Sequence, residues 1–191
     1  MALSPKLQSW HISLAKKDKS LCEVYDLFQE EYSHSQEDIP LIIQLVENPK
    51  YEIPGINFFN GATDLKTHDY IHILLARGLM SKDEAFVLGF TMGSTNKVSS
   101  TEEKIYSFVS QYLYPNVYQF NKEDIEVFKD AVRLGYICDC KPLDKVDYES
   151  LRGLSIEEAR QEVGIPSDLL QSYFKIEKKR YPNSMESQRL V

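Results

Sequence analysis

The residues with the clearest chemical potential lie in the segment THDYIHILLARGLMSKDE. His68, Asp69 and His72 fall within one helical turn, and Glu84 follows after eleven further residues. Neutral imidazole nitrogens and carboxylate oxygens are typical ligands of zinc and of similar first-row divalent metals. Two histidines four residues apart project from the same face of a helix, so one cation can contact both. The spacing therefore predicts a metal site.

Glu84 can reach these histidines if the segment folds as a pair of helices. We expect a first helix over residues 64–77, a tight turn at 78–80 and a second helix from Ser81. A connection this short predicts that the two helices are antiparallel neighbours. Asp69 lies about 100° around the first helix from the preceding histidine. It is therefore either a fourth ligand or a residue that orients a histidine.

Each candidate ligand also has a purely structural interpretation. A single histidine on an apolar helix face is commonly a core residue, and Ser81 with Glu84 matches a capping box, in which serine and glutamate satisfy free amides at a helix start. Taken together, however, two histidines and two carboxylates would make a poor core, because buried charges need partners. The combination favours metal binding.

Helix signals recur along the whole chain. Apolar residues keep a helical rather than an alternating spacing, and glycines at 78, 135 and 164 follow periodic runs as stop signals. We predict an all-α, single-domain bundle of about seven to nine helices over residues 1–180, with a frayed polar tail at 181–191. The expected capping boxes are Ser20/Glu23, Ser81/Glu84, Ser100/Glu103 and Ser155/Glu158, with Asn121/Asp124 and Ser167 as further caps.

Small residues follow one face of the second predicted helix of the metal segment. Ala85, Gly89 and Gly93 recur every four residues, and Phe86 and Phe90 lie beside them. Glycine inside a helix costs about 1 kcal/mol relative to alanine, so a steric reason for it is expected. The bare face can accept a neighbouring helix, or it can form a groove for a slender lipid tail.

Composition limits the class of protein. The 191 residues carry a net charge of −7 and a pI near 5.2, which argues against a nucleic-acid partner because no basic stripe is available for phosphates. No apolar run is long enough for a membrane span. Three cysteines form no even disulfide framework, so we expect a reducing, cytoplasmic location and a structural role for Cys138 and Cys140.

The N-terminal segment allows two interpretations. Residues 1–17 contain no acidic residue, and Leu3, Leu7, Trp10 and Leu14 fall at heptad spacing. This pattern predicts an amphipathic helix, which either packs on the core or lies peripherally on an anionic membrane surface.

The metal segment also resembles a known family. The pattern His-Asp-x-x-His, eleven residues, then Glu is similar to the signature of the Coq-four family of coenzyme Q biosynthesis proteins, and His68, Asp69, His72 and Glu84 match every defined position. The segment DYESLRGLSIEEARQEVGIP resembles the closing segment of that family. The two matches together span a third to half of the chain. The shorter chain, without an evident mitochondrial presequence, resembles a bacterial or divergent member.

The resemblance implies a helical protein in which those four side chains hold zinc. It further implies binding of prenylated quinone precursors or other lipids at a membrane surface, contact with quinone-biosynthesis proteins, and replacement of a ring carboxylate by hydroxyl. The groove of Ala85, Gly89 and Gly93, with Phe86 and Phe90, would then contact the tail. A homodimer is compatible with this role.

Three alternatives remain open on sequence. The first is a non-enzymatic lipid-binding or scaffold protein in which the metal fastens two helices. The second is a di-iron bundle, which needs two acid-x-x-His pairs; Asp69/His72 is one, and Glu31/His34 is formally another. The third is a phosphohydrolase of the His-Asp type, which requires a separate upstream histidine.

Overall fold

The computed structural model describes residues 10–31, 61–97 and 119–190. Within these ranges the chain is helical and contains no β-strand, which confirms the predicted all-α class. None of the described helices combines the length and the apolar character that crossing a bilayer requires. The elements are α2 (Leu21–Glu31), α4 (Leu65–Leu74), α5 (Ser81–Ser94), α7 (Lys122–Ile137), the 3₁₀ turn η4 (Leu143–Lys145), α8 (Tyr148–Leu151), α9 (Ile156–Val163), α10 (Ser167–Arg180) and α11 (Met185–Gln188).

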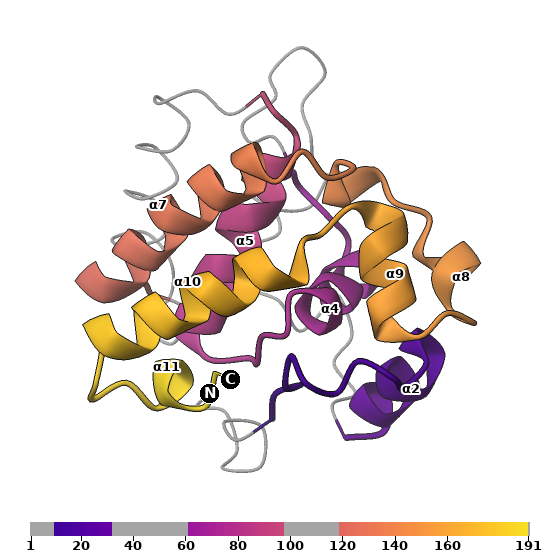
Figure 1. Ribbon diagram of the computed structural model, residues 1–191, viewed down its shortest axis with the longest axis horizontal. Helices are drawn as coiled ribbons and strands as arrows, with labels where there is room; N and C mark the ends of the chain where they lie inside the picture. Colours follow the sequence, from indigo (N-terminus) through magenta and orange to yellow (C-terminus); the bar gives the residue numbers. More distant parts are fainter. Residues whose placement is uncertain (1–9, 32–60, 98–118, 191) are drawn as a thin grey trace.

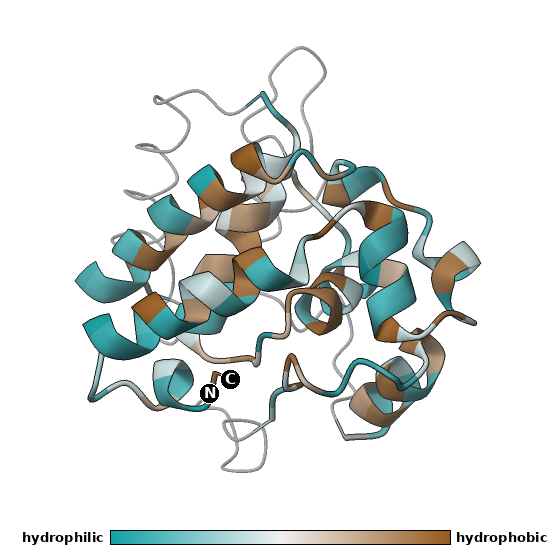
Figure 2. Cartoon of the chain, in the orientation of Figure 1, coloured by the Kyte–Doolittle hydropathy of each residue, from teal (hydrophilic) through white to brown (hydrophobic). Residues whose placement is uncertain are grey.

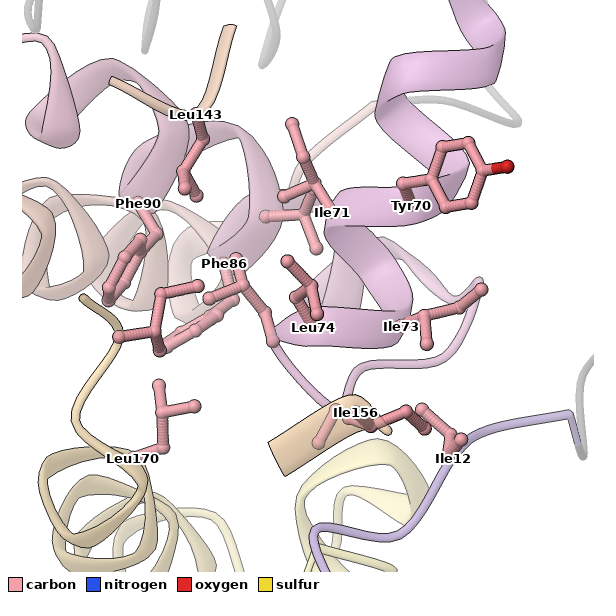
Figure 3. Packing of buried hydrophobic residues seen from close by; sticks show 14 of the residues in the cluster. Ile12, Tyr70, Ile71, Ile73, Leu74, Phe86, Phe90, Leu143, Ile156 and Leu170 are labelled. Carbon is pink, nitrogen blue, oxygen red and sulfur yellow. The ribbon is translucent and has the colours of Figure 1, made fainter. Parts of the chain in front are cut away.

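The helices surround one main apolar core. In Figure 1, α5 lies behind α7 and α10, while α2, α8 and α9 gather on the other side of α4. Figure 2 shows α7, α9 and α10 with alternating polar and apolar stripes, as expected for helices with one buried face. Figure 3 shows how side chains from α4, α5 and more distant segments meet in this core, with Phe86 of α5 near Leu74 of α4.

Several predicted caps are present. The side chains of Asn121 and Asp124 bond reciprocally to each other's backbone amides at 3.1 and 2.9 Å at the start of α7. Ser155 and Glu158 do the same at the start of α9, at 3.2 and 2.8 Å. Gly164 ends α9 in the left-handed conformation with φ of +85°. By contrast Gly135, expected to end a helix, lies inside α7.

The glycines of α5 and α7 are explained by helix packing. α5 packs closely along α7. A Cβ on Gly93 would overlap the carbonyl oxygen of Val132, one on Gly89 would overlap that of Phe128, and one on Gly135 would overlap that of Phe90. The small-residue face of α5 is therefore filled by α7 rather than open. A lipid groove at Ala85, Gly89 and Gly93 is wrong, and Phe86 and Phe90, both fully buried, belong to the core.

This close approach gives a first prediction. Gly93→Ala should lower the free energy of unfolding by about 1–3 kcal/mol, because the added methyl group forces two backbones apart. Gly153→Ala is the matched control, since a Cβ there meets no atom within 4 Å. Urea unfolding measures both. Equal stability of the two variants would contradict the packing explanation.

The described part of the N-terminal segment is not helical. Residues 10–20 contain only a turn and an isolated bridge between Ser20 and Ser155. Their backbone bonds instead to the start of α9, where the amides of Ile156 and Glu157 donate to Lys19 and Lys17 at 2.9 and 3.1 Å. This segment is therefore held by hydrogen bonds to a distant helix, and it is not helical although its apolar residues have helical spacing. The predicted amphipathic helix is therefore wrong for residues 10–17, and residues 1–9 lie outside the described ranges.

The C-terminal segment is folded rather than frayed. Residues 185–188 form α11, and Ser187 and Leu190 are buried. Ser187 Oγ donates to Glu177 Oε1 at 3.0 Å, and Arg189 forms an ion pair with buried Asp83. The polar composition suggested a tail, but its polar groups have buried partners in α5 and α10.

Asp124 gives a pH-dependent prediction. Burial raises the pKa of Asp124 to about 6, although Lys82 lies 3.6 Å away. The folded chain thus keeps a proton that the unfolded chain releases near pH 4, so this group's contribution to stability falls as pH rises from about 4 to about 6.

Asp124→Asn removes the charge and keeps an oxygen for the cap. The native chain loses the contribution of protonated Asp124 as the pH rises, whereas the variant does not. The free energy of unfolding of the variant minus that of the native chain should therefore rise by up to about 3 kcal/mol between about pH 4 and pH 7. Denaturant unfolding at several pH values measures this difference. A difference that does not change with pH would refute it.

Candidate metal centre

Three of the four predicted ligands converge. The Nε2 atoms of His68 and His72 lie 2.9 Å apart, and Glu84 Oε2 lies 3.0 Å from the first and 3.3 Å from the second. Within the described ranges, these three residues form a group of potential ligand atoms that could hold a metal ion. Two imidazole nitrogens and a carboxylate oxygen this close must share protons or a cation, because their lone pairs otherwise repel.

The triangle of atoms has the dimensions of a metal site. In tetrahedral zinc sites with bonds of 2.0–2.1 Å, neighbouring ligand atoms are about 3.3 Å apart. The three separations, 2.9, 3.0 and 3.3 Å, are at or slightly below this value. Two histidines and one glutamate are also a ligand set of catalytic zinc, which leaves the fourth position for water or substrate. The residues present therefore fit a zinc-type cation.

Local helix chemistry positions each ligand. Asp64 caps α4 by accepting a hydrogen bond from the Thr67 amide at 2.8 Å, and the four-residue spacing of the two histidines puts both on one face of this helix. At α5 the cap is one residue earlier than predicted. The helix follows Met80, whose amide donates to Asp83 at 3.2 Å. The Ser81/Glu84 capping box is therefore wrong, and the Glu84 carboxylate instead faces the histidines.

The connection between the two helices differs from the predicted hairpin. α4 ends at Leu74 rather than near Arg77, and Ala76 rather than Gly78 adopts a left-handed conformation, with φ of 53°. α5 packs much more extensively on α7 than on α4. In Figure 1, α4 is seen nearly end-on while α5 lies across the view, so the two helices are not an antiparallel pair. Glu84 reaches the histidines from the first turn of α5.

Burial and charge differ among the three ligands. The His72 side chain is only 1% exposed, whereas His68 and Glu84 are 18% and 30% exposed, so solvent can reach the site from one side. Burial alone would raise the pKa of Glu84, but the adjacent His72 imidazole and the hydrogen bonds from both imidazoles hold it well below its usual range. Glu84 is therefore an anion at neutral pH, as a cation ligand must be.

Asp69 does not join this group. Its Oδ2 accepts a hydrogen bond from Gln29 Nε2 in α2 at 2.9 Å, and the side chain is buried. Burial raises the pKa of Asp69 to about 6, against the lowering effect of the two histidines. Nδ1 of His72 has no hydrogen-bond partner in the described part of the chain, so Asp69 does not orient that ring either. The expected fourth ligand instead joins α4 to α2.

A buried ion network, missed in the sequence, supports the connection between the ligand-bearing helices. Arg77 donates two hydrogen bonds to Glu177, at 3.0 and 2.6 Å, and its guanidinium lies 3.8 Å from the ring centre of Phe86. Asp83, beside Glu84, pairs with Arg189. All four charged groups are buried or nearly so. The single sequence signal was an arginine within the apolar run LLARGLM.

Comparison of the chain with known proteins identifies no relative. No protein-family profile, no curated protein and no solved structure matches the chain. The likeness to the Coq-four family therefore depends on the quoted residues. His34, needed for the di-iron alternative, lies outside the described ranges.

Proposed function

We propose that this protein binds Zn²⁺ or another first-row divalent cation through His68, His72 and Glu84. The observation that carries the proposal is the convergence of their three ligand atoms within 3.3 Å from two helices. The anionic Glu84 and the partial exposure of the group support it, because a cation needs a charged ligand and a route of entry.

The proposed role of the cation is to bind an oxygen group of a ligand. With three protein ligands, one coordination position is open to water or substrate, and a bound divalent metal acts as a Lewis acid toward a carboxylate or phenolate. Guided by the resemblance to the Coq-four family, we propose a prenylated aromatic precursor of ubiquinone as this ligand. The apolar tail requires a binding surface other than the face of α5 that α7 covers.

A structural role for the metal is the second candidate. It is favoured by the limited direct contact between α4 and α5, which a cation held by His68 and Glu84 would join. In that case precursor raises the melting temperature of the protein but its ring stays unchanged.

Metal content and turnover together test the proposal. Protein purified without added ions should contain one divalent metal per chain by elemental analysis, and Asp69→Asn should retain it. Cobalt-substituted protein should change its visible spectrum when a carboxylate or phenolate is added, because the open position takes up the oxygen. Protein that contains no metal would refute the cation site. A cobalt spectrum that does not change with such anions would refute the open coordination position. Mass spectrometry of the incubated precursor distinguishes the catalytic from the structural role.

A further inference from the structure

A cavity of about 500 Å³ lies where the ends of four helices meet. The first turns of α5, α7 and α11 and the last residue of α10 contribute to its wall. The start of α7, the end of α10 and α11 lie together on the left of Figure 1. Ligand cavities in proteins typically have volumes of roughly 300–1,000 Å³. The cavity is therefore large enough for a small organic molecule, and none of the three candidate metal ligands lines it.

The charged side chains of this wall leave negative charge in excess. Lys82 Nζ lies 2.8 Å from Glu123 Oε2, so these two charges are paired within the wall. Arg180 is paired outside the wall, with Asp130 at 2.6 Å. Glu186 also lines the cavity, but its carboxylate bonds to a neutral serine hydroxyl at 2.8 Å rather than to a cation of the described chain. Its charge is therefore left without an opposite charge.

A buried carboxylate adds to this excess. Asp124, next to Glu123, is 1% exposed, and its Oδ1 has no hydrogen-bond partner among the described residues. This oxygen lies 3.6 Å from Lys82 Nζ and so faces the ammonium in the cavity wall. Burial lowers the pKa of Lys82, but the neighbouring carboxylates raise it above its ordinary value. One ammonium therefore shares this region with three carboxylates, the third being that of Glu186.

We propose that this cavity binds a polyamine, a small organic polycation whose ammonium groups pair with Glu186 and Glu123. The excess of carboxylates favours a positive ligand and disfavours an anion such as phosphate. Glu123 can take part although Lys82 already contacts it, because an ionised carboxylate accepts several hydrogen bonds. The open side of the cavity gives access, since the side chains of Glu123 and Arg180 are 54% and 44% exposed.

The spacing of the carboxylates favours an organic cation over a metal ion. These carboxylates are not among the ligand atoms that converge closely enough to hold a metal in the described part of the chain. A flexible chain with several ammonium groups can instead reach carboxylates that lie apart, and each contact is a charge-assisted hydrogen bond. Asparagine and serine side chains in the rest of the wall offer further oxygen acceptors.

Calorimetric titration of the full chain with spermidine tests the proposal. The native protein should bind spermidine saturably, with one molecule per chain, whereas butanediol, which has no ammonium group, should not bind. Glu186→Gln keeps an oxygen for the serine hydroxyl but removes the charge, so it should weaken binding about tenfold or more. No saturable binding of spermidine would overturn the proposal.

A second variant separates this cavity from the general acidity of the protein. Glu162→Gln removes the same charge from an exposed pair with Lys141, which does not line the cavity, and it should keep the native affinity. Equal weakening by both variants would show that spermidine responds only to the net charge of −7. Tighter binding of inorganic phosphate would assign the cavity to an anion, and tighter binding of a trilysine peptide would assign it to a protein partner. Each of these three results would overturn the proposal.

Discussion

Glu177→Gln should lower the free energy of unfolding by about 3–5 kcal/mol, a large share of the about 5–15 kcal/mol of a typical domain. The Glu177 carboxylate is fully buried and accepts two hydrogen bonds from Arg77 and one from Ser187. Without the charge of Glu177, the Arg77 guanidinium stays in the core with Asp83, at 3.9 Å, as its remaining anionic partner among the described residues. An unpaired buried charge is costly because no water replaces the lost partner. Urea or thermal unfolding measures the loss.

An exposed ion pair supplies the control for this prediction. Lys141 and Glu162 are 2.7 Å apart but more than half exposed, so Glu162→Gln should leave the free energy of unfolding nearly unchanged. The double variant Arg77→Met/Glu177→Met should be more stable than either single variant, because no lone charge remains. A Glu177→Gln variant as stable as Glu162→Gln would show that the network does not hold α10 against the connection between α4 and α5.

His72→Ala should remove stoichiometric metal. His72 Nε2 faces both other ligands, and no other imidazole in the described ranges joins the group. Loss of a residue that merely supports a ligand already weakens metal binding by about 10- to 100-fold, so loss of a ligand should exceed about 100-fold. Competition with a chromogenic chelator measures affinity, and elemental analysis measures content.

Glu84→Gln separates loss of a ligand from loss of packing. Truncating the buried imidazole of His72 also leaves a cavity, whereas glutamine fills the space of Glu84 and removes its charge. Both variants should lose metal to a similar degree. His11→Ala is the control, because His11 lies outside the group and should retain metal. Metal retained by both His72→Ala and Glu84→Gln would eliminate the site.

Part of the candidate metal site was predictable because its signals are local. The four-residue spacing of His68 and His72 fixes a shared helix face regardless of the rest of the fold. Glu84 was placed near them through an antiparallel hairpin, which is not how the helices lie, so the correct residue was reached through an incorrect geometry. Asp69 was a candidate fourth ligand, and the hydrogen bond that it accepts from Gln29 could not be foreseen because Gln29 lies 40 residues earlier in the chain. Periodicity carries no information about such pairings.

In the fold, too, local features were predictable from the sequence and contacts between distant residues were not. Caps such as Ser155/Glu158 were predicted because both partners lie in one turn of chain. The glycines of α5 could be read as a groove or as a helix contact, and the choice required knowing that α7 covers that face. The tail at 181–191 looked frayed because its buried partners, Glu177 and Asp83, belong to other elements. Contacts between distant parts of the chain decided the last two cases, helix packing for the glycines and polar partners for the tail.

The connection between α4 and α5 has a consequence for biosynthesis. Gly78 lies against the backbone oxygen of Trp10 and the side chain of Arg189, so residues from both sequence extremes of the described chain meet beside the helices that carry the three candidate ligands. A ribosome makes His68, His72 and Glu84 about a hundred residues before Arg189. A nascent chain that already contains His68, His72 and Glu84 therefore lacks the residues that bury Asp83 and Arg77. These two charged groups become buried only after the last helices have been synthesised.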